Sequence, residues 1–240
     1  NRLYKDMEII KEALTFDDVT LAPNFSQVLP SEVNTSTNLS KNLSLKIPLL
    51  TSAMDTVTES KMAVAIAELG GIGVIHRNLS IEQQISEIRK VKSKKCLVGA
   101  AVGASPREHL RAQKILKENL DLIVVDTAHG HTKKVGEIIK KIILIKPKKT
   151  SVCAGNIATS EAAKFLARLG VDIIKVGIGP GSICTTRLVA GIGVPQLSAI
   201  MNVKMGIGKS KTTIIADGGI KFSGDIVKAL AAGADAVMIG

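Results

Sequence analysis

The stretch from Lys175 to Arg187 places one cysteine, Cys184, in a glycine-rich loop. Three glycines alternate with other residues in this loop: Gly177, Gly179 and Gly181. Such a backbone can approach a ligand closely and present N–H groups to a phosphate or carbonyl oxygens to a cation. Arg187 would lower the pKa of the Cys184 thiol if it also lies near in space, which favours the nucleophilic thiolate. The alternative is a packed, inert cysteine, but the polar neighbours favour a nucleophile.

A second group of residues is typical of a site for a phosphorylated ligand. Asp217-Gly218-Gly219 follows an apolar run and precedes an expected helix start. Paired glycines can bring backbone N–H groups to a phosphate, and the Ser182 hydroxyl and Gly240 would join them if the loops meet. Asp217 could accept two hydrogen bonds from a ribose diol. If the loops do not meet, an ordinary turn in which Asp217 caps the next helix is the better interpretation.

Further segments that add polar groups follow other apolar runs, at the points where strands would end. They are Ser52, Met54 and Asp55; His76, Arg77 and Asn78; Asp126, Thr127, His129 and His131; and Gly155 and Asn156. An aspartate in such a position indicates ligand contact or catalysis. The two histidines invite a metal hypothesis, but the spacing suggests no third ligand, so a histidine-bound metal is not expected.

Alternating strands and helices are the elements expected to position these residues. The expected strands span 49–50, 73–75, 96–102, 122–125, 151–154, 173–176, 213–216 and 236–239. Helices between them predict parallel strands joined by right-handed crossovers. We expect an α/β fold, a parallel (β/α)8 TIM barrel, because nearly every strand ends in a polar or glycine-rich segment and a barrel brings these ends to one face. A doubly wound open sheet is the alternative.

The barrel is expected to occupy residues 49–240, after an irregular N-terminal lead-in over residues 1–48. The chain ends with the eighth strand, so the last helix of a complete barrel is not part of it. Within residues 105–120, we expect Leu110, Leu116 and Leu120 to face the core.

Local signals mark several helix boundaries. Ser80 with Gln83 has the spacing of a capping box, and Ser105 precedes a proline at a first helical position. Gly206 and Gly208 weaken the helix expected over 196–205, because glycine is a poor helix former.

Composition favours a globular protein with reduced thiols. The chain has 240 residues, of which 45% are hydrophobic and only 2% aromatic, so its core must be aliphatic. Cys96, Cys153 and Cys184 have no paired spacing, which is typical of reduced cysteines in the cytoplasm. No signal-peptide pattern is seen, and the apolar stretch over 63–75 is interrupted by Glu68, so we expect no membrane span.

The formal net charge is +11, from 32 Lys and Arg against 21 Asp and Glu. Attraction of phosphorylated ligands, nucleic-acid binding and a plain solvated surface are three interpretations. We favour the solvated surface, because the lysine clusters lack the aromatic stacking partners of a nucleic-acid platform. Nucleic acid is therefore not expected as a partner.

Taken position by position, these motifs resemble the inosine-5′-monophosphate (IMP) dehydrogenase family. The resemblance runs from Leu14 to Gly240. The segments that carry it are Ser52–Glu59, Gly70–Gly73, Asp126–Gly130, Gly155–Asn156, Gly177–Arg187 and Ala216–Ile220. The run Gly-Ile-Gly-Pro-Gly-Ser-Ile-Cys is highly specific for this family and its sister, guanosine-5′-monophosphate (GMP) reductase.

The resemblance implies NAD-dependent oxidation of IMP to xanthosine monophosphate (XMP) through a covalent Cys184 adduct, a step of guanine nucleotide biosynthesis. It implies substrate contacts from Ser52, Met54, Ser182, Asp217, Gly218, Gly219 and Gly240. It implies cofactor contacts from Asp126, Thr127, Asn156, Gly177 and Gly179. It also implies a potassium ion on the carbonyls of Gly179, Gly181 and Cys184, a homotetramer and a cytoplasmic location.

The sequence departs from the family pattern in three places, one of which is the unusual glycine content of the helix over 201–211. The family usually carries a paired regulatory module between the second helix and third strand, where Val91–Cys96 is here a direct join. The mobile flap, with an Arg–Tyr pair thought to activate water, lies beyond Gly240. GMP reductase, which uses NADPH, is the alternative, but it typically has Asp-Val-Ala-Asn-Gly-Tyr where this chain has Asp126-Thr-Ala-His-Gly-His131. A basic nucleic-acid-binding barrel is a third, weaker alternative.

Overall fold

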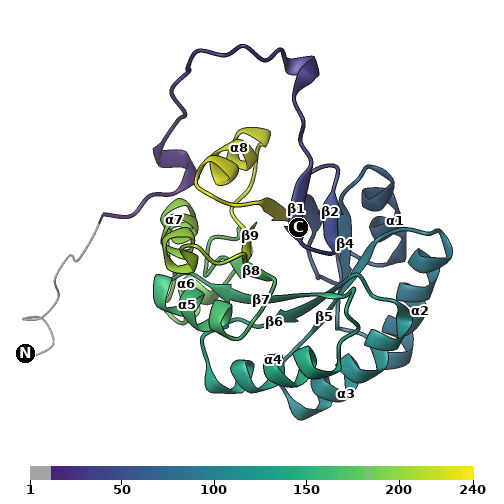
Figure 1. The fold of residues 1–240 in the computed structure, drawn as a ribbon. Coiled ribbons are helices and arrows are strands. Elements are labelled where there is room, and N and C mark those ends of the chain that lie inside the picture. Colours follow the sequence, from purple (N-terminus) through teal and green to yellow (C-terminus); the bar gives the residue numbers. More distant parts are fainter. Residues whose placement is uncertain (1–11, 183) are drawn as a thin grey trace, which may run out of the picture.

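Eight parallel strands form a closed barrel in the computed structural model, which describes residues 12–182 and 184–240 (Figure 1). The strands are β3 (Leu49–Thr51), β4 (Ile72–Ile75), β5 (Val98–Val102), β6 (Leu122–Asp126), β7 (Ser151–Ile157), β8 (Ile173–Val176), β9 (Thr213–Asp217) and β10 (Ala236–Ile239). The last strand pairs with the first, with Val237 opposite Leu49. The predicted TIM barrel is thereby confirmed, and an open doubly wound sheet is excluded.

Helices surround the barrel on its outer side (Figure 1). They are α1 (Ser60–Glu68), α2 (Ile81–Ser93), α3 (Pro106–Ile115), α4 (Lys133–Ile145), α5 (Ser160–Arg168), α6 (Thr186–Val189), α7 (Gln196–Ile207) and α8 (Ser223–Ala231). The structure also contains the short 3-10 helices η1 (Phe16–Asp18), η2 (Pro30–Glu32) and η3 (Leu116–Glu118). One aliphatic cluster lies between helices and strands, and a second fills the barrel interior.

The helices begin where the sequence signals predicted, but one residue that we expected in the core is exposed. Ser80 and Gln83 form the predicted capping box at the start of α2. In α3 the buried positions are Glu108, Arg111, Ala112 and Ile115. Leu110 lies on the opposite face of that helix and is 48% exposed, so its assignment to the core was wrong, whereas Leu116 and Leu120 are buried.

Helix α7 continues through Gly206, which we expected to weaken it. A Cβ atom at this position would lie only 2.5 Å from the carbonyl oxygen of Ser160 and 2.8 Å from the Cβ of Ala163. The glycine is therefore required by the close approach of α7 to α5. The helix ends only at Gly208, whose φ of 53° is left-handed.

The N-terminal region contains regular structure that the sequence analysis did not anticipate. Strands β1 (Thr37–Ser40) and β2 (Leu43–Leu45) form an antiparallel hairpin. Leu39, Leu43 and Leu45 are buried in the cluster that fills the barrel interior. Thr213, the first residue of β9, donates a hydrogen bond of 2.6 Å to the Leu39 carbonyl oxygen. The hairpin thus closes the end of the barrel where the strands begin, opposite the predicted site.

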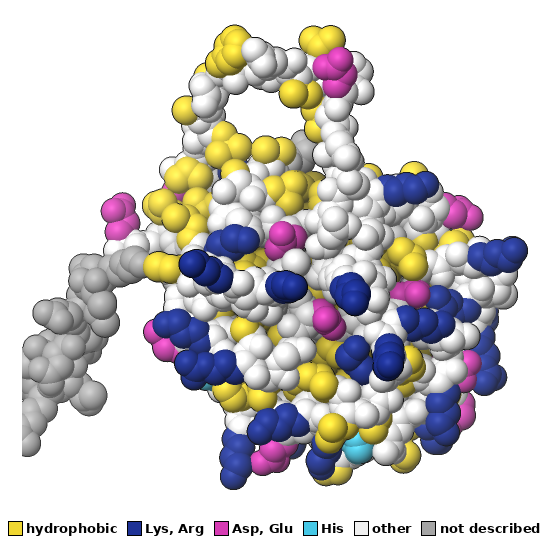
Figure 2. All heavy atoms as spheres, viewed as in Figure 1, with side chains coloured by type: hydrophobic (Ala, Val, Ile, Leu, Met, Phe, Trp, Pro, Cys, Tyr) yellow, Lys and Arg dark blue, Asp and Glu magenta, His cyan; other side chains and the backbone are white. Residues whose placement is uncertain are grey.

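A second N-terminal feature is an arch over residues 20–36, which connects η1 to the hairpin and stands clear of the barrel (Figure 1). Its exposed apolar side chains are Leu21, Phe25, Val28, Leu29 and Val33. Figure 2 shows hydrophobic side chains on this arch and Lys and Arg side chains scattered over the barrel face in view. In the part of the chain that the structure describes, no helix combines the length and apolarity needed to cross a bilayer.

The tight contact at Gly206 gives a testable prediction for stability. Gly206→Ala should lower the free energy of unfolding by about 1–3 kcal/mol, because the new methyl group meets backbone that cannot move aside cheaply. Gly224→Ala in α8 is the matched control, since its Cβ would meet nothing within 4 Å. It should leave stability unchanged or raise it by up to about 1 kcal/mol. Urea unfolding measures both, and equal effects of the two substitutions would contradict the packing account.

Candidate functional site

A cavity of about 300 Å³ opens at the end of the barrel where the strands finish. Its lining comes from four consecutive strands, β6 to β9, from segments that follow them and from Arg77. The lining residues are Arg77, Asp126, Thr127, Ala128, Asn156, Lys175, Gly177, Ile178, Gly179, Cys184, Thr186 and Asp217. The structure therefore brings Cys184 together with Asp217 and with all five residues that the sequence analysis grouped as cofactor contacts.

Lys175 occupies the floor of this cavity and was not singled out from the sequence. Its side chain is 5% exposed, and its Nζ lies 2.9 Å from Asp126 Oδ1 and 2.6 Å from Asp217 Oδ2. It also donates to Asn156 Oδ1. Burial alone would lower the pKa of Lys175, but the carboxylates of Asp217 and Asp126 outweigh burial and raise the pKa above its usual value. The ammonium is therefore protonated throughout the physiological range.

Asn156 extends this polar cluster toward the glycine loop. Its Nδ2 donates to the carbonyl oxygen of Gly177 and to Asp217 Oδ2, both at 2.9 Å. Gln196 provides a further link, because its Nε2 donates to the carbonyl oxygens of Val176 at 2.9 Å and Asp217 at 3.2 Å. The ends of β7, β8 and β9 are consequently tied together by side chains as well as by the sheet.

Cys184 has the properties of a reactive cysteine. Its Sγ lies 3.3 Å from Thr186 Oγ1, and it is partly exposed. Hydrogen bonds from the Thr186 side chain and backbone lower the pKa of the Cys184 thiol most, with a smaller contribution from Arg187. The sequence analysis named Arg187 as the cause and missed the stronger effect of Thr186. Cys153 differs sharply, because complete burial raises the pKa of its thiol to about 12.

The residues predicted to hold a phosphate lie in loops beside the cavity rather than in its lining. A Cβ added to Gly240 would lie 2.9 Å from Ser52 Oγ and 3.1 Å from Met54 Sδ. These loops follow β10 and β3, the pair that closes the barrel.

The other phosphate-side loops also meet. A Cβ added to Gly218 would lie 3.0 Å from Pro180 Cγ and 3.3 Å from the Gly181 nitrogen, and one added to Gly219 would lie 3.2 Å from the Pro180 carbonyl oxygen. Gly218 and Gly219 thus pack against Pro180 and Gly181, the two residues that precede Ser182 in the cysteine loop. The predicted phosphate site needs the two loops to meet in this way. Ile183 lies outside the described residues.

The chemistry of the donor set in the cysteine loop is compatible with a weakly charged cation. Gly179 has a φ of 80°, and the Gly181 carbonyl oxygen accepts the Cys184 N–H at 3.2 Å, which curls the loop. Neutral backbone oxygens suit a monovalent ion better than a divalent one.

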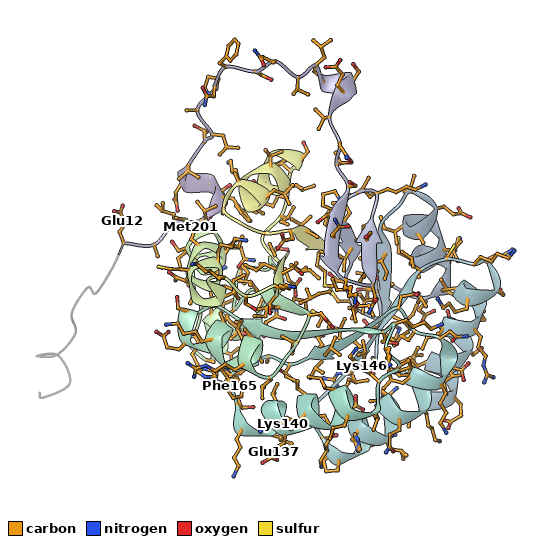
Figure 3. All side chains as sticks on the ribbon, in the orientation of Figure 1. Glu12, Glu137, Lys140, Lys146, Phe165 and Met201 are labelled. Carbon is orange, nitrogen blue, oxygen red and sulfur yellow. The ribbon has the colours of Figure 1, made fainter. Side chains whose placement is uncertain are left out.

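The two histidines after β6 do not belong to the cavity lining. His131 packs against Phe165 of α5, with ring centroids 5.0 Å apart. Figure 3 labels Phe165 together with Glu137 and Lys140 of α4, which line a separate surface groove with His131. Within residues 12–182 and 184–240, no group of three His, Cys, Asp or Glu side chains is arranged to hold a metal ion.

Comparison with known proteins identifies the family. A family model described as “IMP dehydrogenase / GMP reductase domain” matches residues 13–240. The chain belongs to this family. It is 48% identical to the inosine-5′-monophosphate dehydrogenase of Borreliella burgdorferi, over 97% of this chain and 70% of that relative. It is 46% identical to the enzyme of the same name from Cryptosporidium parvum, over 96% of this chain and 68% of that relative.

A more distant relative shows where family members differ in length. The inosine-5′-monophosphate dehydrogenase of Aquifex aeolicus is 36% identical over 96% of this chain and 73% of the relative. That alignment runs over 359 residues although this chain has 240, so the relative carries residues within the aligned region that this chain lacks. The resemblance to IMP dehydrogenase found in the motifs is confirmed.

The Thr186 contact gives a prediction for thiol reactivity. Thr186→Val should raise the pKa of Cys184, because it removes the strongest stabilisation of the thiolate. Alkylation of Cys184 by iodoacetamide should then become slower at neutral pH, and its pH profile should move to higher pH. Thr185→Val is the matched control, since the Thr185 side chain makes no cap hydrogen bond. Identical pH profiles for Thr186→Val and the parent protein would refute the assignment.

Proposed function

We propose that this chain catalyses the NAD-dependent oxidation of IMP to XMP, a step of guanine nucleotide biosynthesis. One observation carries the proposal. Cys184, whose thiol pKa is lowered, lies in the same cavity as Asp217, Asp126 and Asn156. This grouping supports a site in which Cys184 is the nucleophile, Asp217 binds the ribose, and Asp126 and Asn156 face a nicotinamide.

The proposed chemistry begins with the Cys184 thiolate, which attacks C2 of the hypoxanthine ring and forms a C–S bond. The hydrogen on C2 then leaves as hydride with its electron pair. NAD⁺, when bound, supplies the acceptor for that hydride and becomes NADH. Water next adds to C2, the C–S bond breaks, and XMP and the Cys184 thiolate are released with one proton. Splitting one difficult step into two in this way is the advantage of a covalent intermediate.

On the substrate side, we assign the phosphate to Ser182, Gly218, Gly219 and Gly240. The approach of the loops that carry these residues supports the assignment. Asp217 would bind the ribose hydroxyls, and Ser52 and Met54 would lie beside the sugar and base.

On the cofactor side, the dinucleotide would contact Asp126, Thr127, Asn156, Gly177 and Gly179, all of which line the cavity. Carbonyl oxygens of Gly179, Gly181 and Cys184 would hold a potassium ion, whose charge helps fix the conformation of the cysteine loop. Both groups fit the residues present, because the cavity offers polar groups and the loop offers neutral oxygens.

A division of this chain into regions is also proposed. We assign residues 49–240 to the catalytic barrel and residues 1–48 to the lead-in, with the regulatory module of longer relatives absent at the 91–96 join. The arch provides apolar surface for assembly into the homotetramer that the family implies. Three cysteines without disulfide partners support a cytoplasmic location.

The nucleophile can be tested directly with a reactive substrate analogue. A 6-chloropurine ribonucleoside monophosphate should form one covalent adduct, at Cys184, and IMP should protect against it. Buried Cys153 should not react, because its thiol pKa is about 12. Peptide mass spectrometry locates the adduct. Modification of Cys96 or Cys153 in place of Cys184 would overturn the assignment.

The ribose contact gives a second test. Asp217→Ala should weaken IMP binding by about 1.5–3 kcal/mol, the usual contribution of a hydrogen bond to a charged group. Glu161→Ala, which removes an exposed carboxylate at the start of α5, is the control and should bind like the parent protein. Isothermal titration calorimetry gives both affinities, with circular dichroism to confirm folding. Unchanged affinity in folded Asp217→Ala would exclude the proposed contact.

A further inference from the structure

Lys175 is an ion in the middle of an otherwise apolar strand. Its neighbours in β8, Ile173, Ile174 and Val176, are all fully buried, and Lys175 itself is 4% exposed. An ammonium in such a place is costly unless opposite charges and hydrogen bonds compensate for the water it has lost. Its presence therefore indicates a role that an apolar side chain could not fill.

The ammonium group of Lys175 has three polar partners. A lysine ammonium has three N–H donors and no acceptor. Here Nζ donates to Asn156 Oδ1 and Asp217 Oδ2 and forms an ion pair with Asp126 Oδ1 at 2.9 Å. These partners surround the ammonium, and the two carboxylates raise the pKa of Lys175. The contacts therefore favour a structural role for Lys175 over a role as a base or nucleophile.

The two carboxylates held by Lys175 come from opposite sides of the site. Asp217 ends β9 and Asp126 ends β6, with β7 and β8 between them in the barrel. Under the proposed function, Asp217 faces the ribose of the substrate, whereas Asp126 faces the dinucleotide. Their shared ammonium also offsets the repulsion between the two negative charges.

We infer that Lys175 is a positioning residue that holds the ribose-binding carboxylate and the nicotinamide-side carboxylate in one fixed arrangement. This inference rests on the proposed function for the identity of the two ligands. It predicts that losing the ammonium disturbs the substrate side through Asp126, a residue that does not touch the substrate. The disturbance should then be relieved by removing the charge of Asp126.

The test uses Lys175→Met, which keeps the length and removes the charge, and the double variant Lys175→Met/Asp126→Asn. Lys164→Met, at an exposed position of α5, is the control for the substitution type. The first readout is the rate of Cys184 modification by the 6-chloropurine ribonucleoside monophosphate without NAD. The second is the rate with iodoacetamide, which reports the cysteine alone. The third is the midpoint of thermal unfolding.

Lys175→Met should slow the nucleotide reaction by about tenfold or more, because the facing carboxylates then repel each other and Asp217 loses its fixed position. The iodoacetamide rate should stay near that of the parent protein. Lys175→Met/Asp126→Asn should regain most of the nucleotide rate and of the thermal midpoint, and Lys164→Met should change neither.

Two results would overturn the inference: a nucleotide rate in Lys175→Met equal to that of the parent protein, or a double variant no better than the single one in rate and midpoint. Failure of the parent protein to react with the nucleotide would instead overturn the proposed function. In that case the thermal midpoints still decide whether Lys175 holds the two carboxylates together, since charge relief in the double variant needs no ligand.

Discussion

The buried ion cluster of Lys175 with Asp126 and Asp217 is the interaction on which the site depends. Closure of the barrel brings the strand ends to one rim, but closure alone leaves the rim side chains free to turn away. The ammonium removes that freedom, because each carboxylate must stay within hydrogen-bonding distance of it, at 2.9 and 2.6 Å. Asn156 then connects the cluster to the Gly177 carbonyl oxygen of the glycine loop, and Gln196 connects the backbone of Asp217 to that of Val176, directly before the loop. The loop that carries Cys184 is therefore anchored to the charged floor of the cavity.

The aliphatic packing that stabilises the barrel and the residues of the candidate site lie at opposite ends of the barrel. At the end where the strands begin, the β1–β2 hairpin inserts three leucines, and no group from it lines the cavity. At the other end, glycines allow the loops to meet, and polar side chains replace aliphatic ones. This separation explains how the site can hold two carboxylates and a lysine without weakening the aliphatic packing below them.

Periodic and chemical signals were sufficient to predict the barrel, its strand order and the grouping of Cys184 with Asp217, Asp126 and Asn156. What the sequence could not supply were contacts between distant segments. Gly206 is a poor helix former, yet a glycine is needed there because Ser160 of α5 leaves no room for a side chain. The hairpin strands are too short to show a period. Lys175 had a readable signal, a lysine inside a buried strand, whose aspartate partners become evident only once the strands are placed in a barrel.

Under the proposed function, NAD⁺ oxidises IMP through a covalent adduct on Cys184. Stopped-flow absorbance after mixing the protein with IMP and NAD⁺ tests it most directly. We predict a rise in NADH that requires IMP, slows when C2 of IMP carries deuterium, and disappears in Cys184→Ser. An absence of NADH formation in the parent protein, together with GMP-dependent oxidation of NADPH, would contradict the account and assign the chain to the reductase branch of its family.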